Sequence, residues 1–62
     1  MTVKFLCSML SNDVNVAIIH EGQVIAYLPV YYIKSSNRDI FINKIKDYHF
    51  SNKKTKEIHI FI

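Results

Sequence analysis

Polar and apolar residues alternate over the first ten positions of the chain. On an extended backbone, one side of this segment carries only apolar side chains: Val3, Phe5, Cys7 and Met9. Because a period of two is typical of a half-buried strand, the pattern predicts a β-strand over residues 2–10. The polar run at 11–13 predicts the turn that ends it, since Asn and Asp side chains bond their own backbone.

Two further apolar runs follow and predict a hairpin. Residues 14–20 alternate again and are rich in β-branched side chains, which favours a second strand. Glu21 and Gly22 separate this run from a third predicted strand at 23–33, so we expect a tight turn with Gly22 at positive φ. Pro29 lies inside the third run and has no backbone N–H. It therefore predicts a sheet edge, a bulge or the end of the strand at that point.

The pattern then changes to a helical period. Ser36 fits a helix N-cap, with Asp39 three residues later as its capping partner. Between residues 37 and 48 the apolar side chains form one stripe at 3.6-residue spacing: Phe41, Ile42, Ile45 and Tyr48. These features predict an amphipathic helix at 37–48, a polar loop at 49–55 and a final alternating strand at 56–62.

Together the segments predict a single α+β domain over residues 1–62 in the order βββαβ. Three strands form a small antiparallel meander, one helix packs on one face of the sheet, and a C-terminal strand completes it. A domain of 62 residues buries a smaller share of its surface than a larger domain does, and it is only marginally stable by itself.

One helix is too small to cover both faces of this sheet, and both faces are apolar. We expect the uncovered face to expose four large side chains: Ile25, Tyr27, Tyr31 and Phe61. Contiguous apolar patches on a protein surface mark contact sites, and buried aromatic residues dominate the free energy of interfaces. These four residues are the predicted anchors for a protein partner, and the strand edge near Pro29 is a second route of contact.

The titratable side chains form no catalytic or metal-binding pattern. Cys7, His20, His49 and His59 are widely spaced, whereas the ligands of structural zinc sites occur in close pairs. The alternation places Cys7 in the core, where a thiol is inert. Phosphate-binding loops need several glycines, and the chain has one. We therefore expect no enzyme activity, no metal, no cofactor and no small-molecule substrate.

The second half of the chain is basic, and this supports an alternative function. The formal net charge is +3. Five lysines lie on or after the predicted helix: Lys44, Lys46, Lys53, Lys54 and Lys56. With aromatic residues nearby, they predict a small DNA- or RNA-binding regulator as the alternative. Only one arginine is present, which argues against sequence-specific base readout because arginine dominates such contacts.

Composition also indicates where the protein acts. One cysteine excludes an internal disulfide, and no apolar run reaches membrane-spanning length, so we expect a cytoplasmic protein without membrane contact. Ile, Lys, Asn, Tyr and Phe make up 30 of 62 residues, which indicates an AT-rich genome. A chain this short with such a bias is typical of phage or mobile-element accessory proteins.

The principal functional hypothesis is therefore a phage-type protein that binds and inhibits or modulates a host protein, in the cytoplasm of the host cell. A homodimer through the same apolar face is one alternative. A permanent subunit of a larger complex is another.

Overall fold

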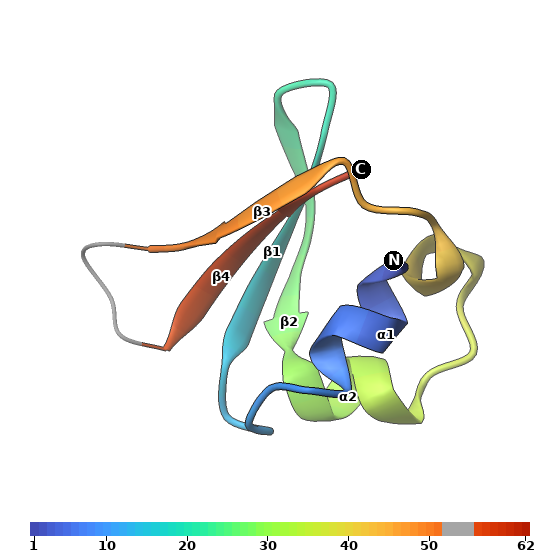
Figure 1. Cartoon of the computed structure of the whole chain (residues 1–62), viewed down its shortest axis with the longest axis vertical. Coiled ribbons are helices and arrows are strands. Elements are labelled where there is room, and N and C mark those ends of the chain that lie inside the picture. The colour runs from blue at the N-terminus through green and yellow to red at the C-terminus, as the bar shows by residue number, and fades with distance from the viewer. Residues whose placement is uncertain (52–55) are drawn as a thin grey trace.

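The computed structural model describes residues 1–51 and 56–62. A four-stranded mixed sheet carries two short α-helices and a 3₁₀ turn on one of its faces (Figure 1). In chain order the elements are α1 (Val3–Cys7), β1 (Asn15–His20), β2 (Gln23–Pro29), α2 (Val30–Ser35), η1 (Asp39–Ile42), β3 (Asp47–Phe50) and β4 (Glu57–Phe61). The predicted α+β class is confirmed, but the order of elements differs from βββαβ.

The sheet has the strand order β2-β1-β4-β3. β1 pairs antiparallel with β2 and parallel with β4, and β4 pairs antiparallel with β3. In the β1–β2 turn, Glu21 has φ 51° and Gly22 has φ 79°. Two successive residues in the left-handed region are typical of a type I′ turn, whose twist matches the flanking strands. The predicted hairpin, including the positive φ of Gly22, is confirmed.

β2 is an edge strand that is bent once and then ends at its proline. Ala26 lies opposite Ile18 while Val24 lies opposite Ile19, so Ile25 is the extra residue of a β-bulge. Pro29 closes the strand, and α2 begins at the next residue. The prediction of a strand that continues to residue 33 is therefore wrong, because the chain turns into a helix where the ladder loses its N–H donor.

The predicted strand at 2–10 is also wrong, since residues 3–7 form α1. Thr2 caps this helix, and its Oγ1 accepts a hydrogen bond from the backbone N–H of Phe5 at 3.1 Å. The buried residues Val3, Leu6 and Cys7 have the spacing i, i+3, i+4. The segment thus holds a helical stripe as well as a period of two, and a short apolar run does not distinguish them.

The predicted amphipathic helix at 37–48 is wrong as well. Ser36 caps no α-helix, and its Oγ accepts the backbone N–H of Arg38 at 3.2 Å. Only the short turn η1 forms; Phe41 is its one buried residue. The chain then runs extended into β3, whose backbone groups pair with β4. Residues 49 and 50, predicted as loop, belong to β3, and positions 52–55 lie outside the described residues.

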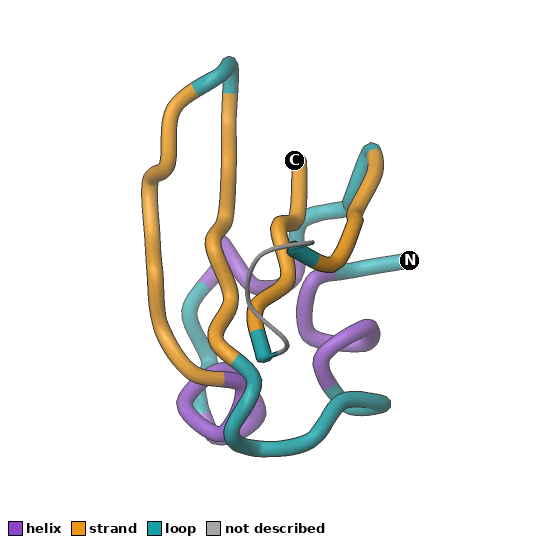
Figure 2. Tube along the Cα trace, turned by 90° about the vertical axis from the view of Figure 1, so that its left-hand side faces the viewer, coloured by secondary structure: helices purple, strands orange, loops and turns teal. Residues whose placement is uncertain are grey.

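The hydrophobic core lies between the sheet and the helical layer. Its buried members are Val3, Leu6, Cys7, Val16, Ile18, Val30, Ile33, Phe41, Ile58 and Ile60. Figure 2 shows the β1–β2 hairpin extending away from the end of the molecule at which α2 lies. Within the described ranges, no helix has the length and apolar character to cross a membrane.

Candidate functional site

The strand pairing assigns each side chain of the sheet to one of two faces. Four strand residues belong to the core, so their side chains point toward the helical layer: Val16, Ile18, Ile58 and Ile60. Side chains at the alternate positions, and those opposite them on β2 and β3, form the outer face, on the side of the sheet away from the core. The outer face comprises Asn15, Ala17, Ile19, Val24, Tyr27, Pro29, Asp47, His49, Glu57, His59 and Phe61, with the bulge residue Ile25 next to Val24.

Three of the four predicted anchor residues lie on the outer face. Ile25 and Tyr27 are exposed there, and Phe61 is half-buried opposite Ile19. Tyr31 is exposed but belongs to α2, because the strand that was expected to carry it ends at Pro29. The structure therefore does not place Tyr31 on the same sheet face as Tyr27.

The outer face is bridged by a hydrogen-bonded group that spans three strands. The Tyr27 hydroxyl donates to Glu57 Oε1 at 2.6 Å, and Glu57 Oε2 lies 3.0 Å from His59 Nε2. Ala17 lies directly between Tyr27 and His59 in the pairing register. Its small side chain leaves room for the Tyr27 ring, and Ala17 itself is 4 % exposed.

Electrostatics and ring contacts extend this group across β3. The hydrogen bond to Glu57, with smaller contributions from desolvation and the carboxylate charge, raises the pKa of Tyr27 above its ordinary value. His49 lies opposite His59, with ring centroids 5.1 Å apart and the rings edge to face. The His49 ring also lies 5.5 Å from that of Phe61. Glu57, His49 and His59 were not among the residues predicted to form a contact. The alternation at 57–61 nevertheless indicates that Glu57 and His59 share a face with Phe61.

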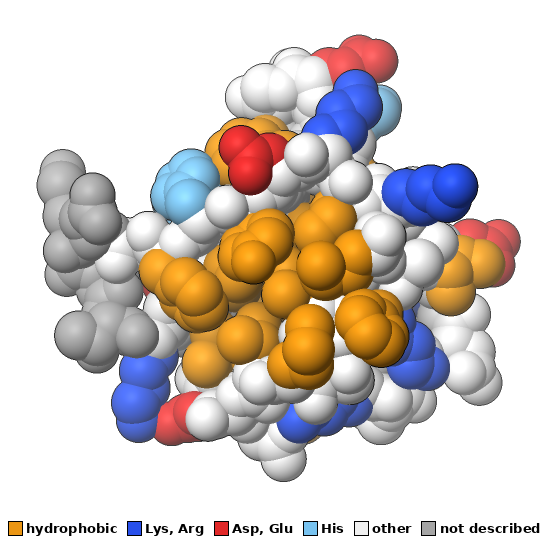
Figure 3. Space-filling model, in the orientation of Figure 1, with side chains coloured by type: hydrophobic (Ala, Val, Ile, Leu, Met, Phe, Trp, Pro, Cys, Tyr) orange, Lys and Arg blue, Asp and Glu red, His pale blue; other side chains and the backbone are white. Residues whose placement is uncertain are grey.

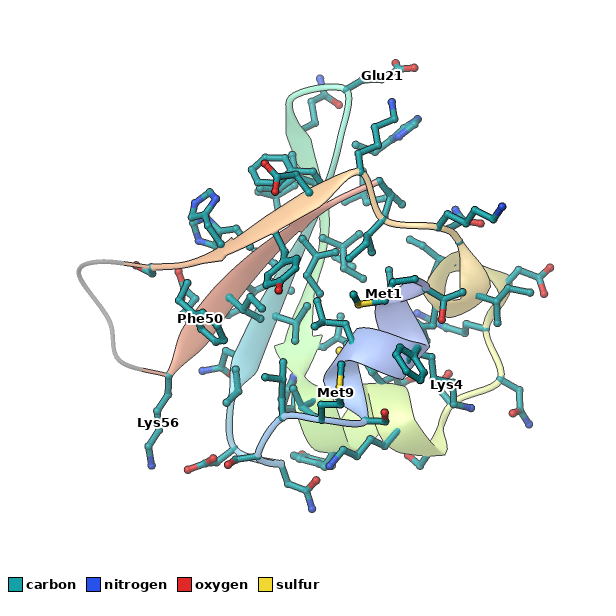
Figure 4. All side chains as sticks on the ribbon, in the orientation of Figure 1. Met1, Lys4, Met9, Glu21, Phe50 and Lys56 are labelled. Carbon is teal, nitrogen blue, oxygen red and sulfur yellow. The ribbon has the colours of Figure 1, made fainter. Side chains whose placement is uncertain are left out.

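A second apolar surface lies on the helix-covered side of the sheet, over the half that the helices leave open. We call it the apolar patch, and it consists of Met1, Phe5, Met9, Tyr48 and Phe50. Each of these side chains is between 41 % and 61 % exposed. Figure 3 shows the hydrophobic side chains gathered at the centre of this view, and Figure 4 shows Met1, Met9 and Phe50 around the same region.

Two elements that were assigned to other structures from the sequence build the apolar patch. Tyr48 and Phe50 lie opposite the buried Ile60 and Ile58, so they project from β3 on the core side. Phe5 belongs to α1 and Met9 follows one turn later. The patch could not be predicted from the sequence, because Phe5 and Met9 fit a strand pattern and Tyr48 fits a helical stripe.

The structure describes three of the five lysines of the predicted nucleic-acid patch: Lys44, Lys46 and Lys56. Lys44 and Lys46 are exposed on the extended segment between η1 and β3. Lys56 lies before β4 and forms an ion pair with Asp13. Their hydrogen bond and mutual charge lower the pKa of Asp13 and raise that of Lys56. Lys53 and Lys54 lie outside the described residues.

The one cysteine is a core residue. Cys7 is fully buried and not disulfide-bonded. Burial raises the pKa of its thiol to about 11, an effect that the charge of Lys34 reduces in part. Its predicted core position is confirmed, although it lies there on a helix and not on a strand. A thiol with this pKa is almost entirely protonated at neutral pH and is a poor nucleophile.

The described residues form neither a metal-binding group nor a pocket. Its His, Cys, Asp and Glu side chains form no group of three or more that could hold a metal ion. No pocket is present among the residues that the structure describes. Comparison of the chain with models of protein families, with characterised proteins and with solved structures finds no match.

Proposed function

We propose that this chain is a small non-enzymatic module that binds another protein through the apolar patch. The observation that carries the proposal is the grouping of five large, half-exposed side chains over one half of the sheet. Aromatic and methionine side chains are enriched at protein interfaces relative to the rest of the surface. Methionine is also flexible enough to adapt to a partner's shape.

The energy available from the patch is of the size that association requires. Full burial of one large apolar side chain contributes about 1.5–3 kcal/mol. Since each patch side chain is roughly half exposed, burying all five contributes about 4–8 kcal/mol. Association itself costs about 4–15 kcal/mol. Burial of the patch thus offsets a sizeable part of the cost of association, and contacts at its rim must supply the rest.

The biological role that we propose is inhibition or modulation of a host protein by a phage or mobile-element accessory protein. The high share of Ile, Lys, Asn, Tyr and Phe, whose codons are AT-rich, supports this role. Ile25 and Tyr27 on the outer face offer a second region of contact. Because Tyr27 is already hydrogen-bonded to Glu57 within the chain, we rank the apolar patch first.

The test is affinity capture from extracts of the native host cell, treated with nuclease, with three forms of the protein. Phe50→Asp places a charge in the apolar patch, and Ile25→Asp places the same charge on the outer face at similar exposure. We expect the wild type and Ile25→Asp to retain the same protein in near-equimolar amounts. Phe50→Asp should lose it while keeping the wild-type circular dichroism spectrum.

Three outcomes contradict the proposal. Undiminished capture by Phe50→Asp removes the apolar patch as the contact. Loss with Ile25→Asp alone, or with Tyr27→Ala combined with Tyr31→Ala, moves the contact to the residues first expected from the sequence. Wild type that captures no protein in any extract contradicts protein binding altogether.

Nucleic-acid binding is the second candidate, and one observation favours it. Lys44 and Lys46 are both exposed, and the half-exposed ring of Tyr48 lies two residues further along the chain. A cationic segment beside an aromatic ring is the combination that binds single strands through phosphate contact and base stacking. Gel retardation of RNA and DNA at low salt tests this candidate. Retention that the Lys44→Ala, Lys46→Ala double variant loses supports it, and absence of retardation ends it.

A further inference from the structure

We infer that the apolar patch receives an acidic amphipathic α-helix of the partner protein, which lies over β3 beside α1. This inference rests on the proposed protein-binding function and adds the chemistry of the partner. It follows from the incomplete cover of the sheet, from the kind of side chains exposed there and from the placement of charge around them.

The helical layer covers the inner strands of the sheet better than the edge strand β3. On the core side, Val16 and Ile18 of β1 and Ile58 and Ile60 of β4 are fully buried, whereas Tyr48 and Phe50 of β3 are 41 % and 50 % exposed. The apolar surface that remains open therefore lies over β3 and continues toward Met9 (Figure 4).

The exposed side chains suit a helix better than an added strand. Strand addition depends on a long open edge, and the edge strand β3 has only four residues. The apolar patch instead offers side-chain surface from two elements, Phe5 and Met9 from the α1 region and Tyr48 and Phe50 from β3. An amphipathic helix buries its i, i+3, i+4 and i+7 side chains against a surface of this kind.

Three lysines lie next to residues of the apolar patch, along the chain or through a bonded neighbour. Lys4 precedes Phe5 on α1, and its ammonium donates to the carbonyl of Ser36 at 2.8 Å. The ammonium of Lys34 donates to the carbonyl of Leu10, next to Met9, at 2.9 Å. Lys44 forms a β-bridge with Thr2, next to Met1. In Figure 3, Lys and Arg side chains border the hydrophobic region at several points.

Four of the five acidic side chains lie away from the patch or are neutralised beside it, and the fifth, Asp39, is exposed on η1. Glu21 is at the tip of the hairpin (Figure 4), and Glu57 and Asp47 belong to the outer side of the sheet. Asp13 is paired with Lys56. A basic rim attracts an acidic partner and repels an identical rim. Charge therefore favours an acidic helix over a second copy of this chain packed face to face.

The two methionines of the chain provide the probe for this inference, because both belong to the patch. Protein labelled with photo-methionine is irradiated in the extract that contains the captured partner, and the adduct is sequenced by mass spectrometry. We expect the cross-linked partner segment to be net negative with apolar residues at i, i+3 or i+4, and i+7. A basic or aperiodic segment, a lipid adduct or an adduct with a second copy overturns the inference.

A second measurement needs no knowledge of the partner. Two synthetic 18-residue peptides carry the same leucine stripe at helical spacing, with glutamates on the polar face of one and lysines on that of the other. Binding is followed by NMR of ¹³C-methyl methionine. We expect the acidic peptide to shift the Met1 and Met9 methyl signals and to bind at least tenfold more tightly than the basic one. Because salt screens charges at the rim, this ratio should fall as salt is raised.

The controls distinguish the competing occupants. Phe50→Asp should weaken binding of the acidic peptide at least tenfold. Val24→Asp, which places the same charge opposite Ile19 at a position that is 61 % exposed, should leave it unchanged. Equal affinity for both peptides contradicts the charge argument. Methyl shifts caused by phosphatidylserine vesicles but not by the acidic peptide assign the patch to a membrane surface, and shifts that depend on protein concentration alone assign it to a dimer; either overturns the inference.

Failure of this inference can be told apart from failure of the proposed function. If Phe50→Asp loses the captured protein but the cross-linked segment is not an acidic helix, protein binding stands and the helix assignment fails. If the wild type captures no protein, the proposed function fails first.

Discussion

Truncation of Phe41 is the most direct test of how this chain folds. Phe41 is fully buried in η1, while its neighbour Ile42 is 61 % exposed. The amphipathic helix expected from the sequence would bury both of these side chains and Tyr48 as well. The structure and the helical interpretation thus predict different costs for two adjacent substitutions.

The structure predicts a large effect for Phe41→Ala. Removing a fully buried phenylalanine side chain costs about 3–5 kcal/mol. At about 0.05–0.15 kcal/mol per residue, a domain of 62 residues has a free energy of unfolding of about 3–9 kcal/mol. Phe41→Ala should therefore remove a third or more of the stability and leave a weakly stable version of the domain unfolded. Ile42→Ala should change it by about 0.5 kcal/mol or less, as exposed substitutions do.

The assay is urea unfolding followed by far-ultraviolet circular dichroism at 25 °C. Phe41→Leu keeps most of the buried volume, so it should cost less than Phe41→Ala and keep that comparison measurable if the alanine variant does not fold. If Ile42→Ala or Tyr48→Ala lowers the free energy of unfolding as much as Phe41→Ala, the helical stripe is real and the placement of η1 is wrong.

Three other predictions concern the hairpin, the buried thiol and the outer face. Gly22→Ala should lower the free energy of unfolding by about 1–2 kcal/mol, because the cost is the left-handed backbone (φ 79°) and not a clash; urea unfolding should show a smaller loss for Gly22→Asn. Cys7 should react with a thiol reagent at pH 8 only after unfolding. Since its pKa rises from 9.0 to about 11 on folding, its contribution to stability is complete below pH 9 and is lost as pH rises toward 11; native labelling as fast as in urea would contradict this. Glu57→Ala should lower the pKa of Tyr27 in a ¹³C NMR titration of the tyrosine rings, because the hydrogen bond to Glu57 raises it. Because the raised pKa favours the protonated hydroxyl in the folded state, this hydrogen bond stabilises the fold below pH 10, and the contribution is lost as pH rises further. An unchanged titration of Tyr27 in the variant would exclude the hydrogen bond to Glu57 as the cause.

The hairpin shows what local sequence alone can decide. Residues 15–20 are rich in β-branched side chains and residues 57–60 alternate polar with apolar, and both segments form strands. Gly22 was expected at positive φ because it separates two apolar runs, and the turn has that geometry. Pro29 was expected to mark an edge, a bulge or a strand end, and it ends an edge strand. In each case the backbone of the residue itself limits what the chain can do.

The anchors expected on the uncovered face illustrate a partial success. The parity of β2 and β4 correctly places Ile25, Tyr27 and Phe61 on the outer face. The position of Tyr31 depends on whether the strand continues past Pro29, and the structure ends it there. The link between Tyr27 and Glu57 joins residues 30 positions apart, so it requires the order of strands, which periodicity does not give.

The sequence by itself determined the α+β class, the β1–β2 hairpin and the last strand, because these follow from backbone preference and from the alternation at 57–60. Tertiary structure decided the segments at 2–10 and 37–50. Their apolar residues fit two periods, so the choice depends on which partner strand or core space satisfies their backbone groups and side chains. The apolar patch is built from these two segments, and for that reason it became visible only in the folded chain.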